Sequence, residues 1–199
     1  MEINDLLHTD GDDNTAGIAQ HAIFSILGNI QVLPKPKLDN SASETGTVED
    51  LVTIADDVVF KPGKKPVKIY CTLEAGSITS EATGGLDGMT YVNKATLFYP
   101  GSKKQGMGLF QWIKNGSGIL WVQELDGSWR QIGHELYPAK VESISFTSGS
   151  KPGDVKGTTI VLKDARKGPA PFFEGNFKVS GVGSGADADG DGNFDIYMS

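Results

Sequence analysis

The stretch that decides the fold is GILWVQELDGSWRQI, residues 118–132. Two apolar segments in it flank the dipeptide Asp126-Gly127. Asp-Gly accepts the positive φ angles of a type I′ turn, so this stretch predicts a tight β-hairpin. Trp121 and Trp129 would be near partners across its two strands, where cross-strand packing stabilises a sheet.

The rest of the chain also reads as short strands separated by turns. Its 199 residues include 26 Gly and 9 Pro, a composition that favours β structure over helices. The one predicted helix covers residues 101–114, where Leu109, Trp112 and Ile113 follow the i, i+3, i+4 spacing of an apolar stripe. The predicted strands cover residues 18–26, 67–74, 89–99, 118–125, 128–132, 138–148, 157–162 and 175–179.

Three segments interrupt this pattern. Residues 48–60 could begin as a short capped helix, but their valines and isoleucine favour a strand, which is our prediction. Residues 34–47 are polar and begin with two prolines, so we expect a loop there. Residues 75–90 contain Gly84-Gly85 and Asp87-Gly88 and also predict a loop.

The charge of the chain is concentrated at its ends. Residues 1–15 hold five acidic residues and residues 186–199 hold four, with no Lys or Arg in either segment. The net charge of −7 therefore leaves residues 16–185 at +2. We expect an acidic arm over residues 1–15, a β domain over residues 16–180, and a Gly/Ser linker with an Asp-rich loop over residues 181–199. The nearly neutral body lacks the clustered basic face of a specific nucleic-acid-binding protein.

The Asp-rich loop has the spacing of a calcium site. Acids at alternate positions before a turn-forming Gly192 let a short loop wrap a hard cation that takes six to eight oxygens, at about 2.3–2.6 Å. The pattern resembles short calcium loops of the dockerin, thrombospondin-repeat and integrin-propeller type. Met198 stands where an EF-hand has a bidentate Glu, so an EF-hand is not expected. An acidic solvated tail is the alternative. The predicted ligands are side chains of Asp187, Asp189, Asp191 and Asp195 with the backbone carbonyl of Asn193.

No constellation of catalytic residues is visible in the sequence. The three histidines, His8, His21 and His134, lie in unlike contexts, and His21 is expected to be a half-buried structural residue. The single cysteine, Cys71, lies in an apolar run and reads as a small buried hydrophobe. Phosphate-binding glycine loops and nucleophile elbows are missing. We therefore do not expect an enzyme. No apolar run approaches the ~20 residues that span a bilayer, and residues 1–5 do not resemble the start of a secretory signal.

Seven short motifs, in a fixed order and spacing, are similar to those of one protein family. The motifs are DNTAGIAQ (13–20), KKPVKIYCTL (64–73), LFYPG (97–101), ELDG (124–127), PAK (138–140), KGTT (156–159) and PAPFFEG (169–175). Each motif is weak by itself, and the order carries the resemblance. On these motifs the sequence resembles the major tail, or tail tube, proteins of long-tailed bacteriophages, particularly those that infect Bacteroidetes hosts, from about residue 10 to residue 180.

The resemblance implies a structural virion protein. Tail tube subunits have a β-sandwich or half-barrel with a flanking helix, and six copies form a ring whose inner sheets join into one β-barrel. The rings stack into a conduit for DNA, with tape measure, tail terminator and baseplate proteins as further partners. The resemblance also implies assembly in the host cytoplasm, a place in the virion tail and non-specific passage of DNA through the tube. A nearly neutral body is compatible with such passage only if acidic side chains line the lumen. The Asp-rich C-terminal loop lies outside the family pattern.

Two other functions stay open at this level. A different virion protein, such as a capsid decoration or tail completion factor, would share the composition. A calcium-dependent module that binds carbohydrate or a cell surface would use the Asp-rich loop, with the tryptophans as its contact face.

Calcium binding by the Asp-rich loop can be tested by removing two ligands. If the loop binds the ion as the spacing predicts, the double substitution Asp189→Ala with Asp191→Ala should abolish calcium binding in a calorimetric titration with a chelator control, because four carboxylates fall to two. An unchanged affinity in the double variant would contradict the site.

Overall fold

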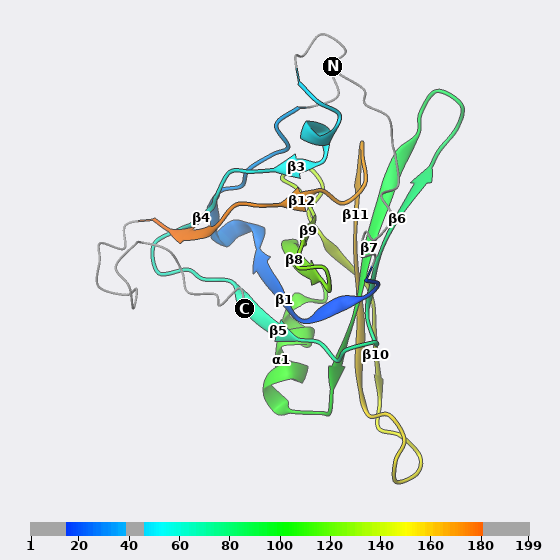
Figure 1. Cartoon of the computed structure of the whole chain (residues 1–199). Helices are drawn as coiled ribbons and strands as arrows, with labels where there is room; N and C mark the ends of the chain where they lie inside the picture. The colour runs from blue at the N-terminus through cyan, green and yellow to red at the C-terminus, as the bar shows by residue number, and fades with distance from the viewer. Residues whose placement is uncertain (1–14, 39–45, 181–199) are drawn as a thin grey trace.

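A computed structural model describes residues 15–38 and 46–180. They form three β-sheets in three layers, with the largest sheet in the middle (Figure 1). The middle sheet has the order β3 (Thr53–Ile54), β12 (Phe172–Phe173), β9 (Trp129–Ile132), β8 (Gly118–Glu124), β1 (Ile18–Ile26) and β5 (Val67–Tyr70). One outer layer, named here the long sheet, has the order β10 (Lys140–Thr147), β11 (Gly157–Arg166), β7 (Thr90–Pro100) and β6 (Ser77–Thr83). The other outer layer consists of β13 (Phe177–Val179), β4 (Val58–Phe60) and β2 (Ile30–Val32).

The central strand β8 explains why the molecule has three layers. Ile119 and Trp121 point into one hydrophobic core, shared with the three-stranded sheet. Leu120 and Val122 point into the other core, shared with the long sheet and the helix. All four side chains are fully buried. A strand that is apolar on both faces can be buried only between two other layers, which is the arrangement seen here.

The single α-helix among the described residues, α1 (Lys104–Ile113), covers one end of the core that lies between the middle sheet and the long sheet. Phe110 and Ile113 are buried there, and the ring of Phe110 packs edge-on against Tyr99 at 5.5 Å. The predicted helix is confirmed, but it starts three residues later than expected. Gly101 adopts a positive φ of 79°, which turns the chain before the helix begins.

The hairpin formed by β8 and β9 is confirmed, but its turn is not type I′. Glu124 N donates to Ser128 O at 2.8 Å and Gly127 N donates to Glu124 O at 3.1 Å, so three residues form the loop. Gly127 has a φ of 95°, whereas Asp126 does not have a positive φ. Asp126 instead accepts a hydrogen bond from Ser128 N at 2.8 Å, which favours a type I turn followed by a left-handed glycine.

Two loop or strand predictions need correction. Residues 75–90, predicted as a loop, contain the seven-residue strand β6, which pairs antiparallel with β7. Its sequence SITSEAT lacks the apolar alternation that identifies strands, because most of its side chains are exposed at the sheet edge. Residues 48–60 are a composite: the short 3₁₀ helix η2 (Glu49–Leu51) precedes β3 and β4. A second 3₁₀ turn, η1 (Leu27–Asn29), joins β1 to β2.

The predicted fold class is confirmed: the protein is mainly β, with the layers of a sandwich and one flanking helix. The described strands do not close into a barrel within one chain. No helix in residues 15–38 or 46–180 is long and apolar enough to cross a membrane.

The two-sided burial of β8 predicts unequal roles for the tryptophans. Trp121→Ala should lower the free energy of unfolding by about 3–5 kcal/mol, because the indole is 0% exposed and its loss leaves a cavity. Trp112→Ala is the matched control, since that side chain is 58% exposed, and it should change stability by no more than about 0.5 kcal/mol. Urea denaturation of both variants measures this, and equal losses would contradict the placement of Trp121.

Candidate assembly surface

The long sheet has two free edges. β6 and β10 are its outermost strands, and each pairs with another described strand on one side only. They are seven and eight residues long, which leaves rows of backbone N–H and C=O groups without a strand partner. Figure 1 shows the hairpin of β6 and β7 extending from one end of the molecule and the hairpin of β10 and β11 from the other. Exposed edges of this length are the standard template for pairing with another chain.

The face of the long sheet that points away from the core, named here the polar face, carries hydroxyl-bearing side chains more often than any other kind. The register places them beside one another: Thr79 lies opposite Lys94, and Ser145 lies opposite Thr159. Alternate residues such as Ala95 and Ile160 point to the core instead. The polar face comprises Ser77, Thr79, Glu81, Thr83, Thr90, Val92, Lys94, Thr96, Phe98, Lys140, Glu142, Ser143, Ser145, Thr147, Thr159, Val161, Lys163 and Ala165.

Glu142 bridges two lysines at the middle of the polar face and offsets one of their two positive charges. Lys94 and Lys163 lie directly opposite each other in neighbouring strands, which would be unfavourable for like charges alone. The two carboxylate oxygens of Glu142 bind one lysine each, at 3.1 and 3.0 Å. Glu142 occupies an irregularity in β10, where the register shifts between Val141 and Ser143. The hydrogen bond from Lys163, and then that from Lys94, hold the pKa of Glu142 below its usual value.

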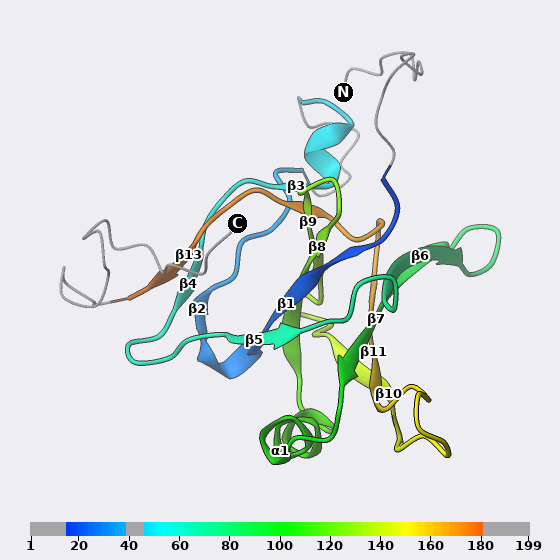
Figure 2. The same ribbon diagram turned by 60° about the horizontal axis from the view of Figure 1, so that its bottom comes forward.

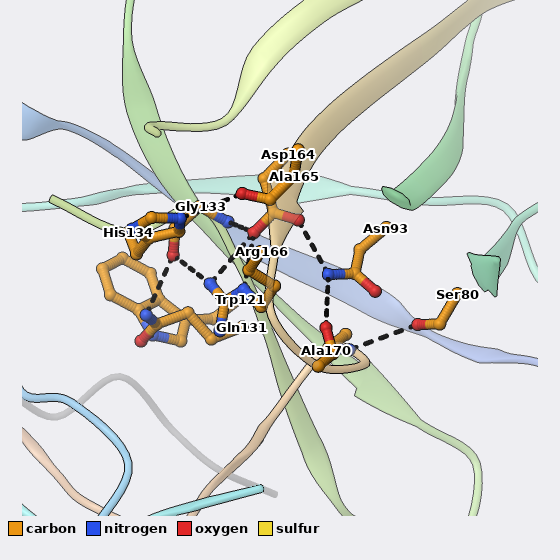
Figure 3. Close-up of polar contacts among 11 residues, drawn as sticks. Ser80, Asn93, Trp121, Gln131, Gly133, His134, Asp164, Ala165, Arg166 and Ala170 are labelled. Atoms are coloured by element: carbon orange, nitrogen blue, oxygen red, sulfur yellow. Dashed lines mark hydrogen bonds and ion pairs between the residues drawn. The ribbon is translucent and has the colours of Figure 1, made fainter. Parts of the chain in front are cut away.

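A buried charge attaches the long sheet to the middle sheet (Figure 3). Asp164 is 1% exposed, accepts three hydrogen bonds and forms an ion pair with Arg166. Asn93 Nδ2, opposite it in β7, donates at 2.8 Å, and Gly133 N donates at 2.6 Å from the end of β9. Arg166 binds the same carboxylate through Nε at 3.0 Å and Nη2 at 2.9 Å. Burial lowers the pKa of Arg166, and Asp164 opposes that shift.

The hydrogen-bond network continues from Asp164 into the core that the middle sheet shares with the three-stranded sheet. Arg166 Nη2 and Gln131 Nε2 both donate to Gly133 O, at 2.7 and 3.0 Å. Gln131 Oε1 in turn accepts from Trp121 Nε1 at 3.0 Å. His134 Nε2 lies 3.0 Å from Ala165 O and must carry its hydrogen to bond there. One connected set of hydrogen bonds therefore fixes the long sheet relative to β8 and β9.

The predicted calcium ligands, Asp187, Asp189, Asp191, Asn193 and Asp195, lie outside the described residues, as do His8 and residues 1–14 of the expected acidic arm over residues 1–15. Residues 15–38 and 46–180 contain no group of three or more His, Cys, Asp or Glu that could hold a metal ion.

The other residues singled out in the sequence have structural places. His21 is half-buried, as expected, and its ring packs edge-on against Tyr70 at 5.9 Å. Burial, together with the nearby Lys68, lowers the pKa of His21. Cys71 is 0% exposed, and burial raises the pKa of its thiol to about 12, which confirms an inert buried side chain. Trp121 and Trp129 are both in the core, but the register places Trp121 opposite Gln131 and Trp129 opposite Gln123, so they are not direct cross-strand partners.

Comparisons of the chain with protein-family models, with curated proteins and with solved structures find no significant match.

Three features of this surface were missed in the sequence: the edge strand β6, the bridging Glu142 and the buried Asp164. One signal was available. Ile160, Leu162 and Asp164 share one phase of the alternation in β11, so a carboxylate occupies a position that the pattern assigns to the core. A charge in that phase requires buried partners.

Removal of the buried charge should loosen the attachment between sheets. Asp164→Asn leaves Arg166 buried without its counter-charge, and we expect a loss of about 3–5 kcal/mol in the free energy of unfolding. Glu135→Gln is the control, because Glu135 forms an exposed pair with Lys35 and pairs of that kind contribute at most about 1 kcal/mol. Thermal unfolding of both variants checks this, and similar melting temperatures would refute it.

Proposed function

We propose that the protein is a structural subunit whose copies join through their long sheets into rings, which stack into the tail tube of a long-tailed bacteriophage. The observation that carries this proposal is the long sheet itself, an open antiparallel sheet with two free edges of similar length. The resemblance of seven sequence motifs to tail tube proteins is its second support.

Strand direction makes this sheet suitable for cyclic repetition. Each strand of the long sheet is antiparallel to its neighbour, so β7 and β10 run in one direction and β6 and β11 in the other. Rotation about an axis roughly along the strands preserves these directions. β6 of one copy would then meet β10 of the next copy in the antiparallel sense, and repetition would close a continuous barrel without edges.

The polar face would line the lumen of such a barrel, since the opposite face is buried under the middle sheet and α1. It does not carry an acidic excess: Lys94, Lys140 and Lys163 outnumber Glu81 and Glu142. The expectation of a lumen lined by acids is therefore replaced here by one lined by hydroxyl groups with a small excess of lysines. Lys94 and Lys163 are bound by Glu142, and Lys140 has no ion-pair partner among the described residues. Such a surface offers DNA few unpaired cations to bind, which suits non-specific passage. Tape measure, tail terminator and baseplate proteins would be partners at the lumen and the tube ends.

A calcium-dependent carbohydrate-binding module is less well supported. Two of the three tryptophans expected to form its contact face, Trp121 and Trp129, are buried in the core. A capsid decoration or tail completion protein could use the same free edges, but would form single rings or bind other proteins without stacking. Negative-stain microscopy of purified full-length protein separates these possibilities: tubes of stacked rings support the proposal, and monomers at every concentration contradict it.

Proline at the edge tests the pairing of β6 with β10 directly. In an antiparallel edge strand, one of two adjacent residues points its N–H away from the sheet, so Glu81→Pro and Ala82→Pro form a natural pair. Where proline replaces the residue whose N–H points away from the sheet, the variant should keep the melting temperature of the wild type and lose ring formation. The other proline variant should have a lower melting temperature, because it loses a hydrogen bond between β6 and β7. Rings formed by both variants would refute edge pairing.

A further inference from the structure

β5 forms a free edge of the middle sheet. It is the outermost strand of that sheet and pairs only with β1 among the described strands. Cys71 N, just after β5, donates to Gln20 O of β1 at 2.6 Å. Bonded and non-bonded pairs alternate along an antiparallel ladder, so Lys68 and Tyr70 form the non-bonded pairs. Their backbone N–H and C=O groups therefore point away from β1 and have no backbone partner in the part of the chain that the structure describes.

The surface around this edge combines positive charge with apolar area. Tyr70 is 40% exposed on one face of β5, and Ile69 on the opposite face belongs to the core shared with the long sheet. Lys64, Lys65 and Lys68 are exposed, and none of the three has an ion-pair partner among the described residues. A strand added here would need apolar side chains on the same face as Ile69, and acidic residues near it would be favourable.

Two parts of the chain lie on opposite sides of the segment from β3 to β5, residues 53–70 (Figure 2). β1 and β2 lie along one side, because β1 pairs with β5 and β2 pairs with β4. Lys61 N donates to Asn29 O at 2.9 Å, which continues this contact between the two strand pairs. On the other side, β12 pairs parallel with β3, and β13 pairs parallel with β4. These parallel pairs share one offset in sequence, 119 residues, so the C-terminal part of the chain follows residues 53–60 in step.

The described part of the chain ends on the side where the edge of β5 is free. Ser180 N donates to Phe60 O at 2.8 Å, so residue 180 lies at the start of the connection that leads from β4 to β5. The seven residue steps from Phe60 to Val67 span at most about 23–25 Å. The 14 steps from Ser180 to Phe194 can reach about 46–50 Å. Residues that follow Phe194 can therefore reach β5 of their own chain, with length to spare for a loop.

Residues 194–198 have the composition of a strand. Their sequence is FDIYM, in which three apolar residues alternate with Asp195 and Tyr197. This is the period of a strand with one buried face, and aromatic and β-branched residues are favoured in sheets. Residues 181–199 also carry four Asp and no Lys or Arg, so their charge is complementary to that of the three lysines beside β5.

We propose that residues 194–198 add as a parallel strand to the free edge of β5 in the same chain, with Tyr197 beside Tyr70. The parallel direction continues that of β12 and β13. The three apolar side chains of the added strand would lie on the same face as Ile69 and extend the core shared with the long sheet. Asp195 would lie beside Lys68, so calcium and Lys68 would compete for its carboxylate. Closing this edge removes a template for unwanted pairing between copies. The inference goes beyond the proposed tube and does not depend on it.

Disulfide cross-linking tests where residue 197 lies. Full-length protein carrying Tyr70→Cys and Tyr197→Cys in a Cys71→Ala background should form a disulfide within the monomer on oxidation in the presence of a chelator. The matched control combines Val32→Cys with Tyr197→Cys, because Val32 is 49% exposed on β2, which is also an edge strand but lies on the opposite side of β4. We expect a yield at least about tenfold lower in the control, since only adjacent strands give a high effective concentration. Equal yields, or a mainly dimeric product in the first variant, would overturn the proposal.

Hydrogen exchange tests the backbone contact without added cysteines. In the wild-type chain, the amides of Lys68 and Tyr70 should exchange at least about tenfold more slowly than in the full-length variant Ile196→Pro, which removes an N–H from the added strand. The amide of Ile69, which points toward β1, is the internal reference and should not change. Ser184→Pro, before the added strand, should behave as the wild type. Equally fast exchange of Lys68 and Tyr70 in the wild type and in Ile196→Pro, measured by NMR, would refute the contact.

The two proposals fail separately in these experiments. Tubes in the microscope without the monomeric disulfide would retain the tube and reject the added strand. A monomeric disulfide in a protein that forms no rings at any concentration would retain the added strand and reject the tube.

Discussion

Two-sided burial of the central strands is the constraint on which the structure depends. Ile119, Leu120, Trp121 and Val122 in β8 alternate between two cores, and β1 beside it does the same with Ile23 and Phe24. Since both faces of these strands are apolar, each face requires its own covering layer. The three-stranded sheet covers one face, and the long sheet with α1 covers the other. The position of the long sheet, and hence of its free edges, follows from this requirement.

The main elements could be predicted from residue patterns because each has a local signal. The hairpin of β8 and β9 follows from apolar segments around Asp126-Gly127, and α1 from the spacing of Leu109, Trp112 and Ile113. β6 could not be predicted in this way. An edge strand exposed on most sides has little need of apolar residues, and its pairing with β7 depends on the tertiary context. The prediction of a type I′ turn was wrong for another reason: the side chain of Asp126 accepts a hydrogen bond from Ser128 N.

The candidate surface was harder to predict than the fold because its contacts join distant parts of the chain. Glu142 meets Lys94 and Lys163 only once three strands are aligned. Asp164 likewise requires Asn93, 71 residues away, and Gly133, 31 residues away. The spacing of residues in the sequence does not show which distant residues come into contact. It does show that Asp164 is a charged residue at a core-facing position of β11, which indicates that buried partners exist without identifying them.

The composition of β6 has a consequence for how copies would come together. Ser, Thr and Glu dominate this strand, with Ile78 as its one large aliphatic residue, so a single edge contact between two copies would be weak. A linear string of copies always has two unsatisfied ends, whereas the closing contact of a circle forms within one complex at high effective concentration. Weak individual contacts would therefore make partial circles short-lived and complete ones persistent. Such a subunit would be monomeric at low protein concentration and would assemble into closed rings over a narrow range of concentration.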